Sequence, residues 1–468
     1  MIGLHLACEQ YMGRHHMDRV LFESTNRRSP AVDLRQALLQ GQAPDRGLYI
    51  PRSFPSLTRH DLAEFGQLPY CEIAFRVLSG FCQGILAPED LRSLCRDAYN
   101  FEVPLEKVFD RVHVMRLDQG PTASFKDFAA RMMARWIGRF VRESGRSLNI
   151  LTATSGDTGS AVASAFHGVA GIRVLVLFPR GEVSHQQRKQ MTTLRDNIRT
   201  IAVDGKFDDC QALVKQAFAD PDLAGIPLSS ANSINIGRLL PQSVYYIYAA
   251  SRLAEPGEPI VLTVPSGNFG NMMGAVIANA MGLPVRRLVV PVNGNDEFPQ
   301  FLKTGHYQKI EPSRNCLSNA MNVGHPSNLA RLVALYGGQM DETGRIHHPP
   351  RLDEMRQKIF STSVSDERTR DTIRDAWQSH RLMLEPHGAV GWRGFLDYLE
   401  TDPLSDVPIA VLETAHPAKF PDEIERIIGI SPSAPPSLAA LDRLPEDNDS
   451  MSAEYPLFKA YLLARYGD

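Results

Sequence analysis

One lysine occupies a position that disfavours a positive charge, and an uncharged amine in such a place can act as a nucleophile. Lys126 lies in the segment PTASFKDFAARMMARW (121–136), whose apolar residues recur every three or four positions and predict a helix. Ser124 and Asp127 have the spacing of a capping box, which would place Lys126 near the second position of that helix. A cation there opposes the helix dipole by about 0.3–1 kcal/mol. An ordinary surface lysine is the alternative, and this segment alone leaves both interpretations open.

Two glycine-rich turns supply backbone N–H groups that could bind anions. The segment TATSGDTGSAVASAFHG (152–168) runs from a predicted strand into an alanine-rich helix. Its hydroxyl and N–H groups at a helix N-terminus suit a small carboxylate. The segment VPSGNFGNMMGAVIANAMG (264–282) has the same order, and its glycines would let the backbone approach a phosphate closely. It matches neither the P-loop nor the dinucleotide-binding pattern, and each turn alone could be an ordinary strand–helix connection.

Two further segments place polar side chains at the ends of predicted elements. In ANSINIGRLLPQSVYY (231–246), Asn235 and Arg238 would share the start of a helix at about residue 235. An arginine there can grip a phosphate through its forked donors, although a capped helix with a surface arginine is the alternative. In ETAHPAKFPDEI (413–424), Thr414 follows the apolar stretch VPIAVL, a predicted strand that it could simply terminate.

These segments belong to an alternating series of strands and helices. Five strand-like stretches are SLNILTAT, GIRVLVLFP, NIRTIAVDG, EPIVLTV and LPVRRLVVPV, and FDDCQALVKQAFAD is a predicted helix among them. Such a series predicts parallel sheet covered by helices, with ligands bound at the C-terminal ends of the strands. Helical stretches near 60–80 and 88–100 precede it. The tail after about 431 is rich in Pro, Ser and Asp, and we predict a loosely packed extension with a short final helix.

The composition excludes several classes of function. The 468 residues, 43% hydrophobic and with net charge −3, suffice for two or three domains and give no electrostatic case for nucleic acid or membrane partners. No apolar run reaches the length of about 18 residues expected of a membrane span. The start of the chain is a poor signal peptide. The six cysteines lack metal-like spacing and predict free thiols in a reducing cytoplasm, and the adjacent pairs His15–His16 and His347–His348 do not predict a metal site.

Seven segments taken together resemble one known family. In chain order they are GPTASFKDF, LTATSGDTGSAVA, SANSINIGRLLPQ, VPSGNFGN, LSNAMNVGHPSN, EPHGAV and TAHPAKF, and they lie between about residues 20 and 430. They resemble the threonine synthases, in particular the longer branch with an extra N-terminal segment. The resemblance implies a pyridoxal 5'-phosphate enzyme of the tryptophan synthase β-like fold type, fold type II. We therefore expect an α/β fold with two parallel-sheet subdomains and an extra, largely helical N-terminal segment.

The resemblance also implies domain limits and residue roles. The expected parts are an uncertain extension (1–17), an N-terminal domain (18–110), a catalytic region (111–430) and a C-terminal extension (431–468). Lys126 would form the Schiff base with the cofactor, Asp157 would lie near the cofactor ring, and Thr414 would face the pyridine nitrogen. The cofactor phosphate would be held by Ser266, Gly267, Asn268, Phe269, Gly270 and Asn271. The substrate carboxylate would contact Thr154, Ser155, Gly156, Asp157 and Thr158, and we infer Asn235 and Arg238 for its phosphate.

The implied activity is a β,γ-replacement that converts O-phospho-L-homoserine and water to L-threonine and phosphate, through the Schiff base on Lys126. A sister enzyme acting on another phosphorylated amino acid, such as a phospholyase or a cysteate synthase-like enzyme, is the alternative. A ligand-sensing relative without catalysis is another. Gln119 replaces a usual histidine and Glu413 a usual glycine of the long branch, and these departures bear on substrate choice. We expect a cytoplasmic monomer or homodimer without a metal site.

Overall fold

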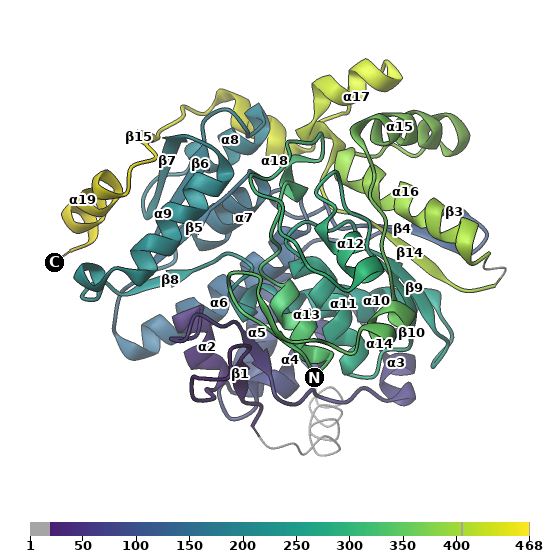
Figure 1. Ribbon diagram of the computed structural model, residues 1–468, viewed down its shortest axis with the longest axis horizontal. Coiled ribbons are helices and arrows are strands. Elements are labelled where there is room, and N and C mark those ends of the chain that lie inside the picture. The colour runs from purple at the N-terminus through teal and green to yellow at the C-terminus, as the bar shows by residue number, and fades with distance from the viewer. Residues whose placement is uncertain (1–18, 404–405, 468) are drawn as a thin grey trace.

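The structure is a computed structural model that describes residues 19–403 and 406–467, and its largest sheet has six strands. Five of its six strands are parallel, and the edge strand β3 runs antiparallel to its neighbour β4 (Figure 1). In spatial order they are β13 (Ile359–Phe360), β10 (Val285–Val289), β9 (Ile260–Thr263), β14 (Ile409–Glu413), β4 (Val112–Arg116) and β3 (Leu105–Phe109). The predicted 1–17 extension, together with Cys8 and His15–His16, lies outside the described residues.

The second sheet has five parallel strands, two of which were not predicted from the sequence. Their order is β15 (Asp449–Ser452), β7 (Ile198–Asp204), β6 (Ile172–Pro179), β5 (Leu148–Ala153) and β8 (Leu228–Ser230). The prediction of a loosely packed C-terminal extension was wrong, because β15 pairs with β7 along its full length. Helix α19 (Tyr455–Tyr466) then packs on α9 (Phe207–Ala219) and buries Phe458, Leu462 and Tyr466, which are spaced four residues apart on one helix face.

The N-terminal segment is largely helical, as predicted. It contains α2 (Leu34–Gln40), α3 (Arg59–Phe65), α4 (Tyr70–Cys82), α5 (Pro88–Ala98) and a two-stranded antiparallel ladder of β1 (Phe22–Ser24) and β2 (Tyr49–Pro51). The helical stretch near 60–80 divides into two helices because α4 begins directly after Pro69. Strand β3 lies before the predicted domain limit at 110 and pairs with β4, so the larger sheet begins inside that predicted domain.

Helix α6 (Lys126–Ser144) carries the first predicted site residue at its first position. The apolar stripe is buried as expected, through Phe128, Ala129, Met132, Met133 and Trp136. The predicted capping box was wrong. The chain turns through a left-handed conformation at Ala123 (φ 52°), and the Asp127 carboxylate accepts hydrogen bonds from the N–H and hydroxyl of Thr122 at 2.8 and 2.7 Å. The Ser124 hydroxyl makes no hydrogen bond within the described residues.

The remaining helices cover the two sheets and complete the fold. Their bounds are α7 (Asp157–Phe166), α8 (His185–Thr192), α10 (Ser243–Leu253), α11 (Gly270–Ala280), α12 (Glu297–Thr304), α13 (Leu329–Leu335), α14 (Leu352–Lys358), α15 (Asp366–His380), α16 (Pro386–Thr401), α17 (Pro421–Ile428) and α18 (Pro436–Ala439). A short ladder joins β11 (Gln339–Met340) and β12 (Ile346–His348). The helix expected at about 235 begins at Ser243, after two 3₁₀ turns at Ile236–Arg238 and Leu240–Gln242.

Three strands end at the positions that the sequence singled out. Strand β5 leads into the turn before α7, β9 leads into the turn before α11, and Thr414 directly follows β14. Across residues 19–403 and 406–467, no helix is long and apolar enough to cross a membrane. Those residues likewise contain no cluster of three or more His, Cys, Asp or Glu side chains that could hold a metal ion.

Candidate active site

A cavity of about 910 Å³ opens where the predicted segments meet. Its inner part contains Lys126 from the start of α6, the β5–α7 turn, the β9–α11 turn and Thr414. The predicted site residues that line it are Lys126, Ser155, Asp157, Thr158, Arg238, Ser266, Gly267, Asn268, Phe269, Gly270, Asn271 and Thr414. Its outer part is lined by the N-terminal segment, including Arg46, and by α9. Ligands therefore have access to the C-terminal ends of strands in both sheets.

Three predicted substrate residues lie outside this lining. The amide of Asn235 donates to the backbone oxygens of Leu38 and Ser230 at 2.9 and 3.0 Å, and its oxygen accepts from Gly237 N. The Thr154 hydroxyl accepts from the N–H groups of Gly156 and Gly159 and so shapes its own turn. Asn235, Thr154 and Gly156 thus hold the backbone, and we do not carry them into the proposed substrate contacts.

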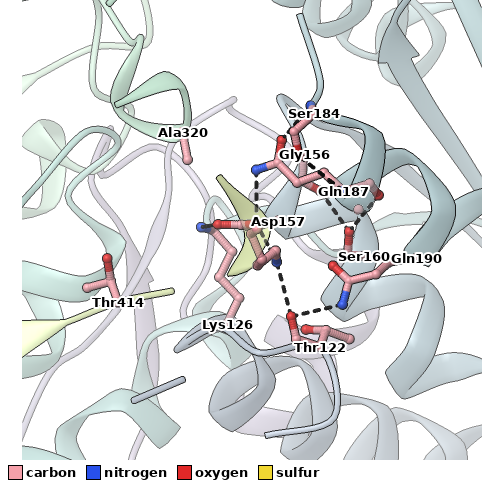
Figure 2. Close-up of polar contacts among 12 residues, drawn as sticks. Thr122, Lys126, Gly156, Asp157, Ser160, Ser184, Gln187, Gln190, Ala320 and Thr414 are labelled. Carbon is pink, nitrogen blue, oxygen red and sulfur yellow. Dashed lines mark hydrogen bonds and ion pairs between the residues drawn. The ribbon is translucent and has the colours of Figure 1, made fainter. Parts of the chain in front are cut away.

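Lys126 is a nearly buried amine that faces a single carboxylate. Its side chain is 12% exposed, and its Nζ lies 3.5 Å from Asp157 Oδ2 (Figure 2). Burial lowers the pKa of Lys126, the Asp157 carboxylate opposes that change, and the nearby cations Lys419 and Arg238 reinforce it. The lowered pKa favours the neutral amine that nucleophilic attack requires.

Asp157 is held more tightly by other residues than by Lys126. Its Oδ1 lies 2.6 Å from Lys419 Nζ and accepts from Gln187 Nε2 at 3.0 Å. Burial alone would raise the pKa of Asp157, but the charges of Lys419 and Lys126 hold it well below its usual range. Lys419 was not predicted as a site residue, although it lies within TAHPAKF, where the flanking Ala418 and Phe420 were a signal of burial.

The β9–α11 turn has the form of a phosphate cradle. It precedes α11, whose first N–H groups have no partners inside the helix. A Cβ atom on Gly267 would come within 2.7 Å of Met321 Cα, so only glycine fits there. Phe269 takes a left-handed conformation (φ 61°), an uncommon strain for a bulky residue. The Asn271 oxygen accepts from the hydroxyls of Tyr245 and Tyr246, whereas its buried Nδ2 has no partner among the described residues.

These features fit the phosphate group of pyridoxal phosphate. The orphaned Nδ2 of Asn271 is a donor that a phosphate oxygen would satisfy, and the crowded glycine lets the backbone come close to the anion. The Asn268 amide fixes the turn to its surroundings, donating to Ser233 Oγ at 2.7 Å and accepting from Ser327 N at 2.6 Å.

Thr414 belongs to a buried polar network behind the cavity. Its hydroxyl lies 3.3 Å from Oε1 of Glu385, which is fully buried. Glu385 also accepts from the N–H groups of His387 and Gly388 at 2.7 and 2.8 Å and contacts Nδ1 of His387. Nε2 of His387 accepts from Ala320 N at 3.0 Å, so His387 carries its hydrogen on Nδ1. Glu385 and His387 lie in the segment EPHGAV, which contributed to the resemblance but had no predicted role.

Arg238 is a buried cation that lines the cavity without a carboxylate partner in the described chain. It is 3% exposed, its Nη1 donates to the backbone oxygen of Ala231 at 2.6 Å, and its Nε has no hydrogen-bond partner. Burial lowers its pKa to about 10, and the Asp127 carboxylate opposes this change. A buried guanidinium with an unused donor is suited to binding an anion.

The two departures from the long-branch pattern lie away from the cavity lining. Gln119 is exposed, and its amide donates to Asp118 at 2.8 Å. Glu413 is fully buried at the end of β14 and accepts from Glu385 N at 3.0 Å. Neither side chain is among those that line the cavity.

Comparison with known proteins agrees with this geometry. The family described as pyridoxal-phosphate dependent enzyme matches residues 102–412, and two further models, the threonine synthase N terminus and the threonine synthase C-terminal domain, match 21–99 and 388–462. The fold and the site therefore define a fold type II enzyme whose cofactor is pyridoxal phosphate.

Relatives and solved structures narrow the family. Threonine synthase of Haemophilus influenzae is 41% identical over 437 residues, covering 92% of this chain and 97% of the relative. That of Escherichia coli is 36% identical over 434 residues, covering 92% and 96%. The structure of pyridoxal phosphate-bound threonine synthase from Brucella melitensis superposes with a TM-score of 0.88 at 32% identity, covering 96% of this chain and all of that one. The chain belongs to the threonine synthase family.

Proposed function

We propose that this protein converts O-phospho-L-homoserine and water to L-threonine and phosphate. The observation that carries the proposal is the position of Lys126. Its amine, with a lowered pKa, faces a cavity between the phosphate cradle at 267–271 and the β5–α7 turn. Membership of the threonine synthase family supports the choice of substrate.

The residues that would hold the cofactor follow from the site. We assign Lys126 as its covalent attachment point, the turn from Ser266 to Asn271 as the phosphate cradle, and Thr414 as the partner of the ring nitrogen. Asp157 would lie beside the attachment point. When bound, pyridoxal phosphate supplies an electron sink that stabilises negative charge at the substrate Cα. The Thr414 hydroxyl is neutral, so it supports the ring nitrogen without adding a charge.

The substrate would lie between the two anion-binding regions. We assign its carboxylate to the β5–α7 turn, where Ser155 and Thr158 line the cavity at the N-terminus of α7. We assign its phosphate to Arg238, whose Nε is unpaired and buried. Holding both ends of the substrate would fix Cα near Lys126, and such orientation is a large part of enzymatic rate enhancement.

Lys126 would then act as the base and acid of the reaction. Its Nζ, when free, would take the proton from the substrate Cα, and it is the group we expect to move protons at Cβ and Cγ. The replacement is completed by loss of a proton from Cβ and of phosphate from Cγ, return of a proton to Cγ, addition of water at Cβ and return of a proton to Cα. A neutral amine with a lowered pKa is suited to both directions of transfer.

A product assay separates this function from its alternative. The purified protein is incubated with O-phospho-L-homoserine, and threonine, phosphate and 2-oxobutanoate are measured. We expect threonine and phosphate in equal amounts. Phosphate with 2-oxobutanoate as the main product would point instead to a phospholyase, and no turnover together with a colourless protein would point to a ligand-sensing relative.

The organisation of the chain is part of the same proposal. We place an N-terminal domain at 18–110, a catalytic region at 111–430 and a C-terminal extension at 431–468. The family matches at 21–99 and 102–412 support a division near residue 100, before β3, rather than at 110, and the match at 388–462 joins the extension to the end of the catalytic region. We propose a cytoplasmic enzyme that works as a monomer or homodimer, without nucleic acid partners.

A further inference from the structure

Two buried lysines share one carboxylate at the inner end of the cavity. Lys419 Nζ lies 2.6 Å from Asp157 Oδ1, whereas Lys126 Nζ lies 3.5 Å from Asp157 Oδ2. Lys419 is fully buried, and Asp157 is 2% exposed. Lys419 also donates to the backbone oxygen of Thr122 at 3.0 Å, which fixes its Nζ in place. Asp157 thus has its shorter and better-formed ion pair with the lysine that does not line the cavity.

Asp157 has enough support to remain ionised without Lys126. Gln187 Nε2 donates to its Oδ1 at 3.0 Å, and Asp157 occupies the first position of α7, where the helix dipole favours a negative charge (Figure 2). Lys419 supplies a full positive charge at ion-pair distance. A proton on Lys126 is therefore not needed to balance this carboxylate.

The other charges around Lys126 are cations. Arg238, from the 3₁₀ turn at 236–238, disfavours a proton on Lys126, as does Lys419, from the 3₁₀ turn at 417–419. His387, on α16, accepts at Nε2 from Ala320 N and is therefore neutral, so it adds no charge near Asp157. Asp157 is accordingly the single carboxylate that opposes deprotonation of Lys126 among the groups facing it in the described chain.

We propose that Lys419 is a positioning residue for the reaction, which engages Asp157 permanently and so leaves Lys126 as a neutral amine. Without Lys419, the unbalanced carboxylate would turn to Lys126 and stabilise its ammonium form. The cofactor aldehyde and the substrate Cα both require the neutral amine, so Lys419 would control the reactivity of Lys126 without touching either. This inference rests on the proposed function for the role of Lys126, but its chemistry concerns the three side chains alone.

The test measures the charge state of Lys126 directly. The full-length chain is freed of its cofactor with hydroxylamine and labelled with acetic anhydride at a series of pH values. Peptide mass spectrometry then gives the midpoint of labelling at Lys126. We expect Lys419→Met to raise this midpoint by about one pH unit or more, a tenfold loss of neutral amine at a given pH. The double variant Lys419→Met/Asp157→Asn should return the midpoint close to that of the parent.

Two further variants keep the test decisive. Asp157→Asn alone should lower the midpoint, because two cations then face Lys126 without a carboxylate, and it provides the answer if Lys419→Met does not fold. Lys189→Met is the matched control. Lys189 is also buried, but its Nζ donates to the backbone oxygens of Leu441, Asp442 and Leu444, away from Asp157. It should leave the Lys126 midpoint unchanged.

The outcomes separate this inference from the proposed function. An unchanged midpoint in folded Lys419→Met, an unchanged midpoint in Asp157→Asn, or an equal shift in Lys189→Met would each overturn it. Readdition of pyridoxal phosphate to the parent chain should protect Lys126 from acetylation. If protection is absent while the midpoints shift as expected, the proposed attachment point fails and the charge relationship stands.

Discussion

The Thr414 hydroxyl lies 3.3 Å from Oε1 of Glu385, and this contact sets the direction of its hydrogen. Glu385 is an acceptor that is already fixed by the N–H groups of His387 and Gly388. The Thr414 hydrogen is therefore directed at the carboxylate, and its lone pairs remain available on the cavity side. The Glu385 carboxylate would therefore contact the ring nitrogen only through the neutral Thr414 hydroxyl. A substitution at Thr414 tests this arrangement without adding a charge.

Thr414→Val is expected to keep the cofactor bound but to slow threonine formation roughly two- to tenfold, the range that corresponds to the loss of one neutral hydrogen bond. The ratio of 2-oxobutanoate to threonine should rise, because the ring nitrogen loses its partner. The measurements are kcat and the product ratio. Thr263→Val, at a buried threonine that does not line the cavity, is the control and should leave both unchanged. A product ratio in Thr414→Val equal to that of the parent would remove Thr414 from the ring.

Arg238→Ala is expected to lower kcat/KM for O-phospho-L-homoserine by roughly 10- to 150-fold while leaving cofactor content intact. The physical reason is the loss of a charge-assisted contact worth about 1.5–3 kcal/mol. Steady-state kinetics and the cofactor absorbance measure the two effects. Arg46→Ala is the control, because Arg46 lines the outer cavity with a side chain that is 69% exposed. Equal losses in both variants would indicate a general electrostatic effect rather than a phosphate contact.

Glu413→Gln is expected to stabilise the protein at neutral and alkaline pH but not at acidic pH. Burial, and then the neighbouring Glu385, raise the pKa of Glu413 well above its usual 4.5. As the pH rises past 4.5, the unfolded chain loses this proton while the folded chain keeps it, so the parent loses stability. Glutamine stays neutral in both states, and the difference should grow by up to about 1.4 kcal/mol per pH unit.

Unfolding followed by denaturant at several pH values between 5 and 8.5 measures this difference. Glu102→Gln is the control, because Glu102 is exposed and the substitution removes a surface carboxylate rather than a buried one. A constant difference for Glu413→Gln would mean that Glu413 is ionised in the folded protein.

Gly267→Ala is expected to weaken cofactor binding by at least about tenfold, because the added methyl group would meet the Met321 backbone at 2.7 Å and displace the phosphate cradle. Cofactor affinity is measured by titrating the stripped protein with pyridoxal phosphate. Gly181→Ala is the control, because a Cβ atom there meets no atom within 4 Å. Unaltered affinity in Gly267→Ala would contradict the cradle assignment.

Much of this fold could be predicted from hydrophobic periodicity alone. Strands β5, β6 and β7 and helix α9 form where their apolar stretches indicated, since each is bounded by turn residues that limit the alternatives. The role of β15 could not be predicted, because its sequence DSMS is polar and its strand conformation depends on pairing with β7. Tertiary pairing of this kind leaves no periodic signal.

The candidate site divides in a similar way. Lys126, Thr414 and the turn at 266–271 could be predicted because they combine unusual residue types with the ends of predicted elements. Lys419 and Glu385 could not be predicted, because each matters only through a contact with a residue that is distant in the sequence. Lys419 pairs with Asp157, and Glu385 contacts Thr414. Asn235 was predicted to bind the substrate because it is close to Arg238 in the sequence. Its side chain instead caps a 3₁₀ turn.

Lys126 is the residue to which we propose that pyridoxal phosphate attaches. The purified protein is reduced with borohydride, digested, and mapped by mass spectrometry. We expect the cofactor to be fixed to the peptide containing Lys126, and we expect Lys126→Ala to retain bound cofactor through the 267–271 turn but to yield no fixed label and almost no turnover. Cofactor fixed to Lys419, Lys189 or any other lysine of the parent protein would contradict this proposal.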